Sequence, residues 1–360
     1  MTTVLIMAGG TGGHVFPALA VADVLRTRSC RVVWLGTRRG IEARLVPAAG
    51  IPVEWVRVAG LRGKGLGSWL AAPVKLLQAL ADAVGAIRRT QPDVVLGLGG
   101  FVAGPGGLAA RLLGRPLVIH EQNAIAGLTN RILARFAHTV AEAFPGGFAA
   151  GVGAVAVGNP VRQSIEALGA AAAGRAPHEP RHLLVFGGSQ GAAALNRIVP
   201  AALALLSPGE RPAVLHQTGR DRRETVASSY AALGVEAEVC EFIDDMAAAY
   251  GWADLAVSRS GALTVAELAA AGLPGLLVPF PAAVDDHQTQ NARFLADRGA
   301  AVLLAEDGLT AERLAAELRK LLGADPRALA AMAEAARRAA APGAAEQLAD
   351  LCLAAAGGAT

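Results

Sequence analysis

Short apolar runs alternate with longer stretches of helical periodicity along almost the whole chain. The runs are rich in valine, leucine and isoleucine, as expected of strands that are buried on both faces. The predicted strands of the first half are Val4–Met7, Arg31–Leu35, Val53–Arg57, Val94–Leu98, Pro116–His120 and Thr139–Ala141. Those of the second half are His182–Phe186, Ala213–Gln217, Ala237–Glu241, Leu255–Ser258, Gly275–Val278 and Ala301–Leu304. The alternation predicts an α/β protein with parallel sheets, covered by helices on both faces and connected by right-handed crossovers.

The alternation is interrupted near the middle of the chain. Gly158-Asn159-Pro160 breaks the pattern, and Ala167–Pro180 is rich in alanine, glycine and proline, which indicates a linker. A chain of 360 residues also exceeds what one hydrophobic core usually serves. We therefore predict two doubly wound domains, 1–161 and 162–340, and a terminal helical segment, 341–360, that packs back on the first domain.

Composition and charge exclude several classes of protein. The formal net charge is only +3, which is too slight for a nucleic-acid-binding protein. Cys30, Cys240 and Cys352 lie far apart, which favours reduced thiols in the cytosol over a disulfide framework or a zinc site. We find no signal-peptide pattern and no run of about 18 apolar residues. The expectation is a soluble protein that meets a membrane only from the side.

The segment from Met7 to Ala20, MAGGTGGHVFPALA, is the most informative in the chain. A predicted strand, Val4–Met7, leads into four glycines around Thr11 and then into a helical pattern. Glycines at such a turn allow close approach of a ligand, and the helix N-terminus favours an anion, most simply a phosphate. His14 stands at the start of this helix, where a neutral imidazole can take a proton from a hydroxyl. The structural alternative is a tight turn that carries an exposed histidine.

Two further glycine-rich turns follow predicted strands and open helices. We call the segments Gly9–Gly13, Gly97–Gly107 and Gly187–Gly191 the first, second and third glycine turns. The first turn does not fit the dinucleotide pattern G-x-G-x-x-G, the Walker A pattern with its lysine is absent, and no isolated acidic residue clearly ends the second strand. These features disfavour an NAD-dependent dehydrogenase. Ligands of doubly wound sheets bind at the carboxyl ends of the strands, so two such edges facing each other would form a cleft.

A family resemblance extends over residues 9–292. The segments that carry it are GGTGGHVFPALA from Gly9, GLGGFVAGPGG from Gly97, HEQNAIAGLTNR from His120, GNPVR from Gly158, FGGSQGA from Phe186, SRSGALTVAELAAAGLP from Ser258 and PFPAAVDDHQTQNA from Pro279. In this order they resemble the bacterial peptidoglycan glycosyltransferases of family 28. The resemblance implies the GT-B fold, with UDP-N-acetylglucosamine (UDP-GlcNAc) bound mainly by the second domain and the acceptor, lipid I, mainly by the first. It implies no cofactor.

The donor site implied by the resemblance centres on Glu267, whose carboxylate would accept hydrogen bonds from both ribose hydroxyls. The alternative is an ordinary first-turn glutamate that complements the helix dipole. Gln288 would bind the sugar hydroxyls, because an amide both donates and accepts, and the backbone at Ile243 would bind the uracil. The remaining residues expected at UDP-GlcNAc are Thr11, Gly12, Gly13, Asn123, Arg162, Ser189, Ala262, Leu263, Thr264, Val265 and Ala266.

A metal site at Asp285, Asp286 and His287 is the alternative use of the polar stretch before Gln288. The chain contains no Asp-x-Asp pair, so we expect no metal. Helix N-termini and backbone N–H groups would then offset the charge of the leaving diphosphate.

The acceptor side requires a base that takes the proton of the attacking hydroxyl. His14 is the favoured candidate, and Glu121 is the second, acting directly or by orienting other groups. The structural alternative for Glu121 is a carboxylate that caps the first glycine turn. Thr11 would help to position the acceptor diphosphate. The second glycine turn has the form of a site for that diphosphate, through Gly99, Gly100, Gly104 and Gly106.

A basic and apolar segment runs from Arg62 to Leu77. Lys64, Trp69, Leu70, Lys75 and Leu76 form a predicted patch for anionic lipids at the cytoplasmic face of the inner membrane. The alternative is an amphipathic helix that packs on the first sheet. Other proteins of cell-wall synthesis and division are further expected partners, and nucleic acid is not.

The predicted activity is an inverting, metal-independent transfer of GlcNAc to the MurNAc 4-hydroxyl of lipid I, giving lipid II in peptidoglycan synthesis. Three alternatives share many of the features above. They are another UDP-sugar transferase, a UDP-GlcNAc 2-epimerase, and a non-catalytic subunit that binds a nucleotide sugar. The fold alone does not distinguish among them.

Overall fold

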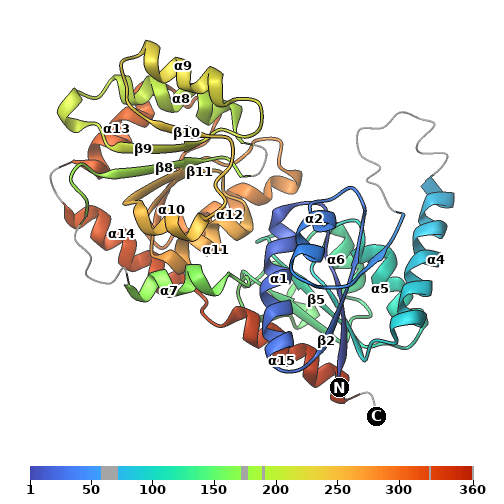
Figure 1. Ribbon diagram of the computed structural model, residues 1–360. Coiled ribbons are helices and arrows are strands. Elements are labelled where there is room, and N and C mark those ends of the chain that lie inside the picture. The colour runs from blue at the N-terminus through green and yellow to red at the C-terminus, as the bar shows by residue number, and fades with distance from the viewer. Residues whose placement is uncertain (58–71, 172–176, 189–190, 324–325, 359–360) are drawn as a thin grey trace. The chain divides into compact units, whose positions relative to one another are not determined.

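The structure is a computed structural model that describes residues 1–57, 72–171, 177–188, 191–323 and 326–358 (Figure 1). The chain divides into two compact units. Unit 1 comprises Met1–Arg162 together with Gly343–Thr360, and unit 2 comprises Gln163–Pro342. The boundaries derived from the sequence, after residues 161 and 340, lie within two residues of these.

Unit 1 contains a seven-stranded parallel sheet in the order β3-β2-β1-β4-β5-β6-β7. The strands are β1 (Thr3–Met7), β2 (Arg31–Gly36), β3 (Val53–Trp55), β4 (Val94–Gly97), β5 (Leu117–Glu121), β6 (Thr139–Glu142) and β7 (Val155–Ala156). The helices are α1 (Gly12–Thr27), α2 (Glu42–Ala48), α4 (Ala72–Thr90), α5 (Ala103–Leu112), α6 (Leu128–Leu133), the 3-10 turn η1 (Ala150–Val152) and α15 (Ala344–Gly357).

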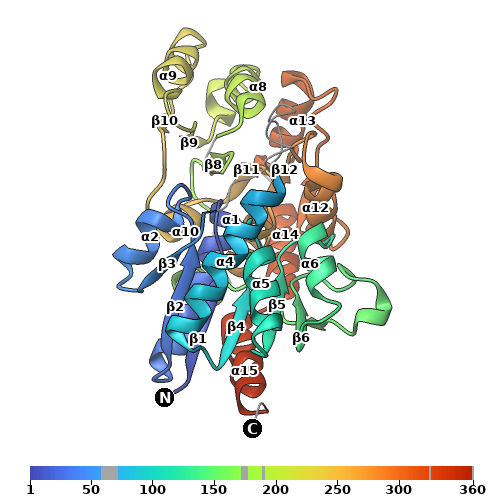
Figure 2. The same cartoon turned by 90° about the vertical axis from the view of Figure 1, so that its right-hand side faces the viewer.

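Successive strand residues of unit 1 enter two different hydrophobic layers, because side chains alternate across a sheet. Val4 and Ile6 pack with the apolar residues of α1 and α15 on one face. Leu5 and Met7 pack with α4, α5 and α6 on the other. Figure 2 shows these three helices next to one another. Both faces of the sheet are therefore covered.

Unit 2 contains a six-stranded parallel sheet in the order β10-β9-β8-β11-β12-β13. The strands are β8 (His182–Phe186), β9 (Ala213–Gln217), β10 (Glu238–Cys240), β11 (Leu255–Ser258), β12 (Gly275–Leu277) and β13 (Ala301–Leu303). The helices are α7 (Gln163–Ala171), α8 (Ala193–Ala204), α9 (Arg223–Ala232), α10 (Met246–Trp252), α11 (Ala262–Ala271), α12 (His287–Ala296), α13 (Ala311–Leu322) and α14 (Pro326–Ala339), with 3-10 turns η2 (Pro208–Glu210) and η3 (Val284–Asp286). Leu183 and Val185 pack with α8 and α13 on one face.

Three local features differ from the prediction. Helix α7 occupies the start of the predicted linker, since alanine favours helix strongly and Gly169 lets α7 approach Ala270 of α11 closely. Helix α5 begins at Ala103, inside the second glycine turn and not after it. Strand β7 was not predicted, because its two residues are exposed and too short to show a pattern.

The strand order reverses at the same place in both units, between β1 and β4 in unit 1 and between β8 and β11 in unit 2. Every predicted strand is present, so the predicted fold class of two doubly wound parallel sheets is confirmed. In such sheets ligands bind beyond the carboxyl ends of the strands at the point of reversal. The glycine turns follow β1, β4 and β8, and the Ser258–Glu267 segment follows β11. All four therefore stand where a ligand is expected.

Candidate functional site

The first glycine turn is held by a buried carboxylate from helix α2. Glu42 is fully buried and accepts the backbone N–H of Gly10 at 3.0 Å and both the N–H and the hydroxyl of Thr37, at 3.0 and 2.7 Å. Neighbouring glycines make room for it, because a Cβ on Gly9 would lie 2.7 Å and one on Gly40 1.9 Å from its oxygens. One N–H of the turn is thus bound to the chain's own carboxylate. The cap on this turn is Glu42, not Glu121.

His14 lies in the first turn of α1, half-buried, with its Nδ1 3.3 Å from the Thr11 hydroxyl oxygen. The second glycine turn packs against it. Gly99 has φ +99°, and a Cβ there would lie 2.8 Å from His14 Cδ2 and 3.0 Å from Nε2. A Cβ on Gly100 would lie 2.3 Å from the carbonyl oxygen of Gly9. The first two glycine turns are therefore in contact, and only glycine at position 99 leaves space for the imidazole.

Glu121 ends β5, and its buried carboxylate is saturated with hydrogen bonds. It accepts the backbone N–H and the side-chain amide of Asn123 at 3.0 and 3.1 Å, the N–H of Gly127 at 3.1 Å and the amide of Asn130 at 2.9 Å. This pattern shapes the loop after β5. It favours the orienting role for Glu121 over direct proton transfer, because these four donors belong to the loop after β5 and to α6.

His120 is completely buried and joins β5 to its neighbours. Its Nε2 lies 2.9 Å from the Gly158 carbonyl oxygen, and its Nδ1 lies 3.3 Å from Nε2 of Gln122. Burial lowers the pKa of His120 to about 4, so the ring is neutral at pH 7. Gln122 also donates to the Leu98 carbonyl at 2.7 Å, and Asn159 donates to the Gln122 carbonyl at 3.0 Å. His120 is thus a structural residue, as expected of the end of a buried strand.

Two glycines predicted to bind the acceptor differ in their surroundings. Gly104, near the start of α5, has only Thr129 Cγ2 near the position of its missing Cβ, at 3.6 Å. Gly106 faces the sheet, where a Cβ would lie 2.2 Å from the sulfur of Met7, and its N–H is bonded to the Val102 carbonyl at 3.1 Å. Gly106 thus allows α5 to pack on β1, and its N–H is used within the helix; its role in binding the acceptor stays a prediction.

In unit 2, the end of β11 and the start of α11 hold most of the predicted donor residues. Ala262, Leu263, Thr264, Val265 and Ala266 form the first turns of α11. Glu267 follows them and is buried, and its carboxylate accepts the hydroxyl of Tyr250 at 2.9 Å. This hydrogen bond orients one oxygen of the Glu267 carboxylate.

Gln288, in α12, is tied to the end of β11 and to the loop after β12. Its side-chain oxygen accepts the N–H of Phe280 at 2.9 Å, and its carbonyl accepts the Ser260 hydroxyl at 2.8 Å. Asn291 donates to the Ser260 carbonyl at 3.2 Å. The structure thus brings Gln288 beside the segment that opens α11. The family resemblance assigns both to the donor.

The other predicted donor residues are dispersed. Ile243 is half-buried in the loop between β10 and α10. In unit 1, Asn123 is bonded to Glu121, and the guanidinium carbon of Arg162 lies 5.2 Å from the centre of the Phe16 ring. Ser189 lies outside the described residues, as do Lys64, Trp69 and Leu70 of the predicted membrane patch. Lys75 and Leu76 are exposed at the start of α4.

Two groups of metal-ligating residue types have structural roles. Asp286 accepts the Thr289 hydroxyl at 2.6 Å at the N-terminus of α12. His178, His182 and Asp254 cluster at the amino-terminal edge of the unit 2 sheet, away from the glycine turns. The Asp254 carboxylate there accepts the N–H of His182 at 2.8 Å and contacts Nδ1 of His178 at 3.0 Å, which holds the chain at the entry to β8.

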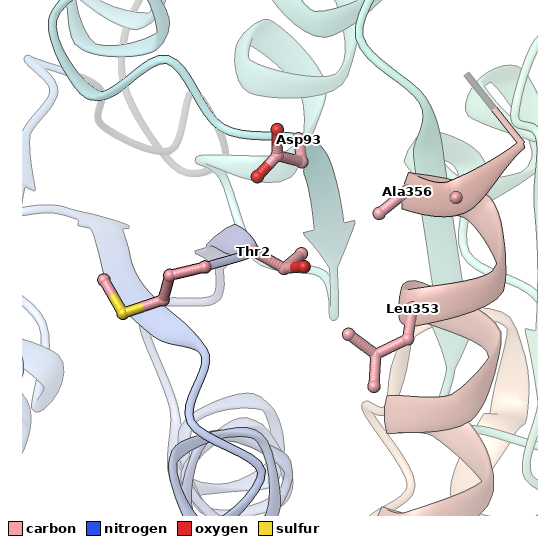
Figure 3. Close-up of a pocket in the computed structure, with 6 residues that line it drawn as sticks. Thr2, Asp93, Leu353 and Ala356 are labelled. Carbon is pink, nitrogen blue, oxygen red and sulfur yellow. The ribbon is translucent and has the colours of Figure 1, made fainter. Parts of the chain in front are cut away.

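A shallow cavity of about 390 Å³ opens at the amino-terminal edge of the unit 1 sheet (Figure 3). Thr2 and Asp93 line it from the sheet, and Leu353 and Ala356 line it from α15. Asp93 accepts the N–H of Thr3 at 2.7 Å. The cavity lies at the edge opposite the glycine turns and contains no predicted site residue.

Two doubly wound sheets that carry glycine turns at their points of reversal have the architecture of the GT-B fold. Residues 4–142 match the glycosyltransferase family 28 N-terminal domain, and residues 182–348 match the family 28 C-terminal domain. The chain belongs to glycosyltransferase family 28.

Similar proteins cover the chain from end to end. The UDP-N-acetylglucosamine–N-acetylmuramyl-(pentapeptide) pyrophosphoryl-undecaprenol N-acetylglucosamine transferase of Nitrosococcus oceani is 60% identical over 359 residues, which is 99% of each chain. The transferase of the same name from Methylococcus capsulatus is 57% identical over 98% of this chain and 99% of that one. The crystal structure of Acinetobacter baumannii MurG is 43% identical, with a TM-score of 0.83, and the match covers 98% of this chain and 100% of that chain. The resemblance found in the motifs is therefore confirmed.

Proposed function

We propose that the chain transfers GlcNAc from UDP-GlcNAc to the MurNAc 4-hydroxyl of lipid I and so forms lipid II, with inversion at the anomeric carbon. The observation that carries this proposal is the 60% identity, over both units, to a transferase named for this donor and this acceptor. The residues at the carboxyl ends of the strands support it. Those of unit 1 suit the acceptor, and those of unit 2 suit UDP-GlcNAc.

The acceptor side of the mechanism rests on His14. When Nδ1–H donates to the Thr11 hydroxyl, Nε2 carries the lone pair, and this atom is the one beside Gly99. Nε2 takes the proton of the attacking hydroxyl as that oxygen forms its bond to the anomeric carbon. The glycosidic bond to UDP breaks on the opposite face, which gives inversion. Glu42 fixes the first glycine turn, and Glu121 fixes the loop after β5.

The donor side rests on α11. Glu267 accepts hydrogen bonds from the ribose hydroxyls, with its carboxylate oriented by Tyr250. The first N–H groups of α11 and α8 and their positive dipole ends stabilise the negative charge that develops on the leaving diphosphate. Gln288 binds hydroxyls of GlcNAc. Because backbone donors supply this stabilisation, the proposed reaction requires no metal ion.

The acceptor is lipid-linked, and unit 1 presents an apolar surface on three neighbouring helices. Its exposed apolar residues are Val74, Leu76 and Leu77 of α4, Leu108 and Leu112 of α5, and Leu128 and Ile132 of α6. The exposed basic residues Lys75, Arg111 and Arg131 are interleaved with them. None of the helices in the described ranges is long and apolar enough to cross a bilayer. We assign this surface to peripheral binding at the cytoplasmic face of the membrane, where anionic lipids attract the basic residues.

Vesicle sedimentation tests this surface. Binding to vesicles of phosphatidylglycerol and phosphatidylethanolamine is expected to fall in a Leu77→Asp, Leu112→Asp variant. The matched control is Leu233→Asp, which changes an exposed leucine of unit 2 and is expected to leave binding unchanged. Equal binding of the double variant and the wild type would contradict the assignment.

The proposed reaction is tested with UDP-GlcNAc, a short-chain lipid I analogue and a chelator. Wild-type protein is expected to form product, and His14→Ala is expected to lose turnover while its affinity for UDP-GlcNAc is unchanged. Loss of the reaction in chelator would reject the metal-free mechanism, and full turnover by His14→Ala would reject the base. Release of UDP-ManNAc without acceptor would indicate an epimerase, and a thermal shift with NAD alone would indicate a dehydrogenase.

A further inference from the structure

The side-chain amide of Gln122 has a fixed orientation. Its nitrogen donates to the Leu98 carbonyl at 2.7 Å and lies 3.3 Å from Nδ1 of His120. His120 must carry its proton on Nε2, because Nε2 faces the Gly158 carbonyl at 2.9 Å and a carbonyl only accepts. Nδ1 is therefore an acceptor, and both hydrogens of the Gln122 amide are used. The carbonyl oxygen, Oε1, consequently points away from Leu98 and His120.

This oxygen is buried and lacks a hydrogen-bond partner among the described residues. Gln122 is only 2% exposed. Buried carbonyl groups without a partner are rare, because burial removes the hydrogen bond that water would supply. The hydrogen bonds to Leu98 and His120 prevent the amide from rotating, so Oε1 cannot turn toward another donor. An oxygen held in this way is suited to a donor that arrives with a ligand.

The position of the oxygen identifies the ligand. Gln122 Oε1 lies 3.6 Å from the point where a Cβ of Gly99 would stand, and His14 Nε2 lies 3.0 Å from the same point. Both atoms therefore lie within 4 Å of one point beside Gly99, where no side chain separates them. In the proposed function Nε2 of His14 faces the attacking hydroxyl. Oε1 of Gln122 then faces a group next to that hydroxyl on the acceptor sugar.

We propose that Gln122 Oε1 accepts a hydrogen bond from the C6 hydroxyl of the acceptor sugar, and this inference rests on the proposed function. In a muramyl residue the C3 neighbour of the 4-hydroxyl is an ether oxygen, which has no hydrogen to donate. The C5 neighbour bears a hydroxymethyl group, whose C6 hydroxyl is a donor. With His14 engaged by the 4-hydroxyl, the C6 hydroxyl satisfies the remaining acceptor. Gln122 is then an acceptor-binding residue that also selects the orientation in which the 4-hydroxyl meets His14.

The test is a thermodynamic cycle like a double-mutant cycle, with one change in the protein and the other in the substrate. Four values of kcat/KM are measured: wild type and Gln122→Met, each with the lipid I analogue and with its 6-deoxy form. The 6-deoxy form is expected to lower kcat/KM of the wild type about tenfold or more, because it leaves Oε1 unpaired. Gln122→Met is expected to react with both acceptors equally. The KM for UDP-GlcNAc should not change in any of the four measurements.

Each other outcome counts against the proposal. Losses that multiply in the double combination would show that Gln122 and the C6 hydroxyl act independently. Equal kcat/KM of the wild type for both acceptors would overturn the proposal outright, and this comparison holds even if Gln122→Met does not fold. Failure of the proposed function is distinguishable, since the wild type would then turn over neither acceptor.

Discussion

The carboxylate of Glu42 accepts the backbone N–H of Gly10 across 32 residues of sequence, at 3.0 Å. This hydrogen bond joins helix α2 to the first glycine turn, which leads into the helix that carries His14. Glu42 lies in α2 and not at the end of the second strand, where a dinucleotide-binding fold places an acidic residue, and its carboxylate points into the glycine turn.

Replacement of Glu42 by glutamine is expected to reduce kcat and to lower the free energy of unfolding by about 1–3 kcal/mol, because an amide group then faces N–H donors. Glu142→Gln is the matched control, since Glu142 is also a buried carboxylate of unit 1 and accepts the N–H groups of Gly146 and Phe148. Urea unfolding and steady-state kinetics check both variants. Equal loss of kcat in the two would show a general effect of stability and not of His14 placement.

Alanine at Gly99 is expected to displace the His14 imidazole, since its Cβ would lie 2.8 Å from Cδ2. A displacement of this kind is expected to lower kcat by up to about 10²-fold. Gly114→Ala is the control, because Gly114 also has positive φ but has nothing within 4 Å of the added carbon. Both variants carry the backbone strain of about 1–2 kcal/mol, whereas only Gly99→Ala should lose turnover. Normal kcat in Gly99→Ala would contradict the role of the contact.

Removal of the Tyr250 hydroxyl is expected to raise the KM for UDP-GlcNAc about tenfold, because the Glu267 carboxylate loses a charge-assisted hydrogen bond that orients it. The KM for the acceptor should stay unchanged. The only other tyrosine, Tyr230, is also buried in unit 2 and contacts His216 at 2.8 Å. Tyr230→Phe should therefore lower stability without changing the KM for UDP-GlcNAc. A Tyr250→Phe enzyme with wild-type KM would argue against a role for Glu267 in binding the ribose.

Stability is expected to fall as the pH drops from about 6.5 to 4. Burial lowers the pKa of His120 and of His216 to about 4, so within this range the unfolded chain binds protons that the folded chain does not. Each histidine should contribute a loss on the order of 3 kcal/mol. Urea unfolding at a series of pH values measures it, and His216→Phe should remove one share of the dependence. A free energy of unfolding that is constant over this range would refute the buried neutral state.

The fold was accessible from sequence because parallel strands buried on both faces read as short apolar runs. Their ends shift by at most two residues in the structure. Helix α7 was assigned to a linker because an alanine-rich stretch has the composition of a linker and the propensity of a helix. Packing of Gly169 against α11 decides between the two, and that contact is invisible in the sequence.

The site could be predicted only in part, because contacts between residues distant in sequence leave no local pattern. His14 and Glu267 stand directly in glycine-rich or helix-opening motifs, which mark them. Glu42 and Gln122 act through hydrogen bonds to residues 32 and 24 positions away, so the chain around them shows no motif for those contacts. The packing role of Gly106 is visible only in the structure, because a glycine needed for packing and one that binds a phosphate look alike in a glycine-rich segment.

Helix α15 gives the chain an order of assembly. Its buried residues Leu348, Ala349 and Cys352 belong to the same hydrophobic layer as Val4 and Ile6 of β1, a strand that precedes all of unit 2 in the chain. This layer of unit 1 remains open on the ribosome until all of unit 2 has been translated, whereas unit 2 is continuous in sequence. We therefore expect unit 2 to reach its native core first during synthesis. Nascent chains that end before residue 343 should expose apolar surface on unit 1 and be recognised there by chaperones.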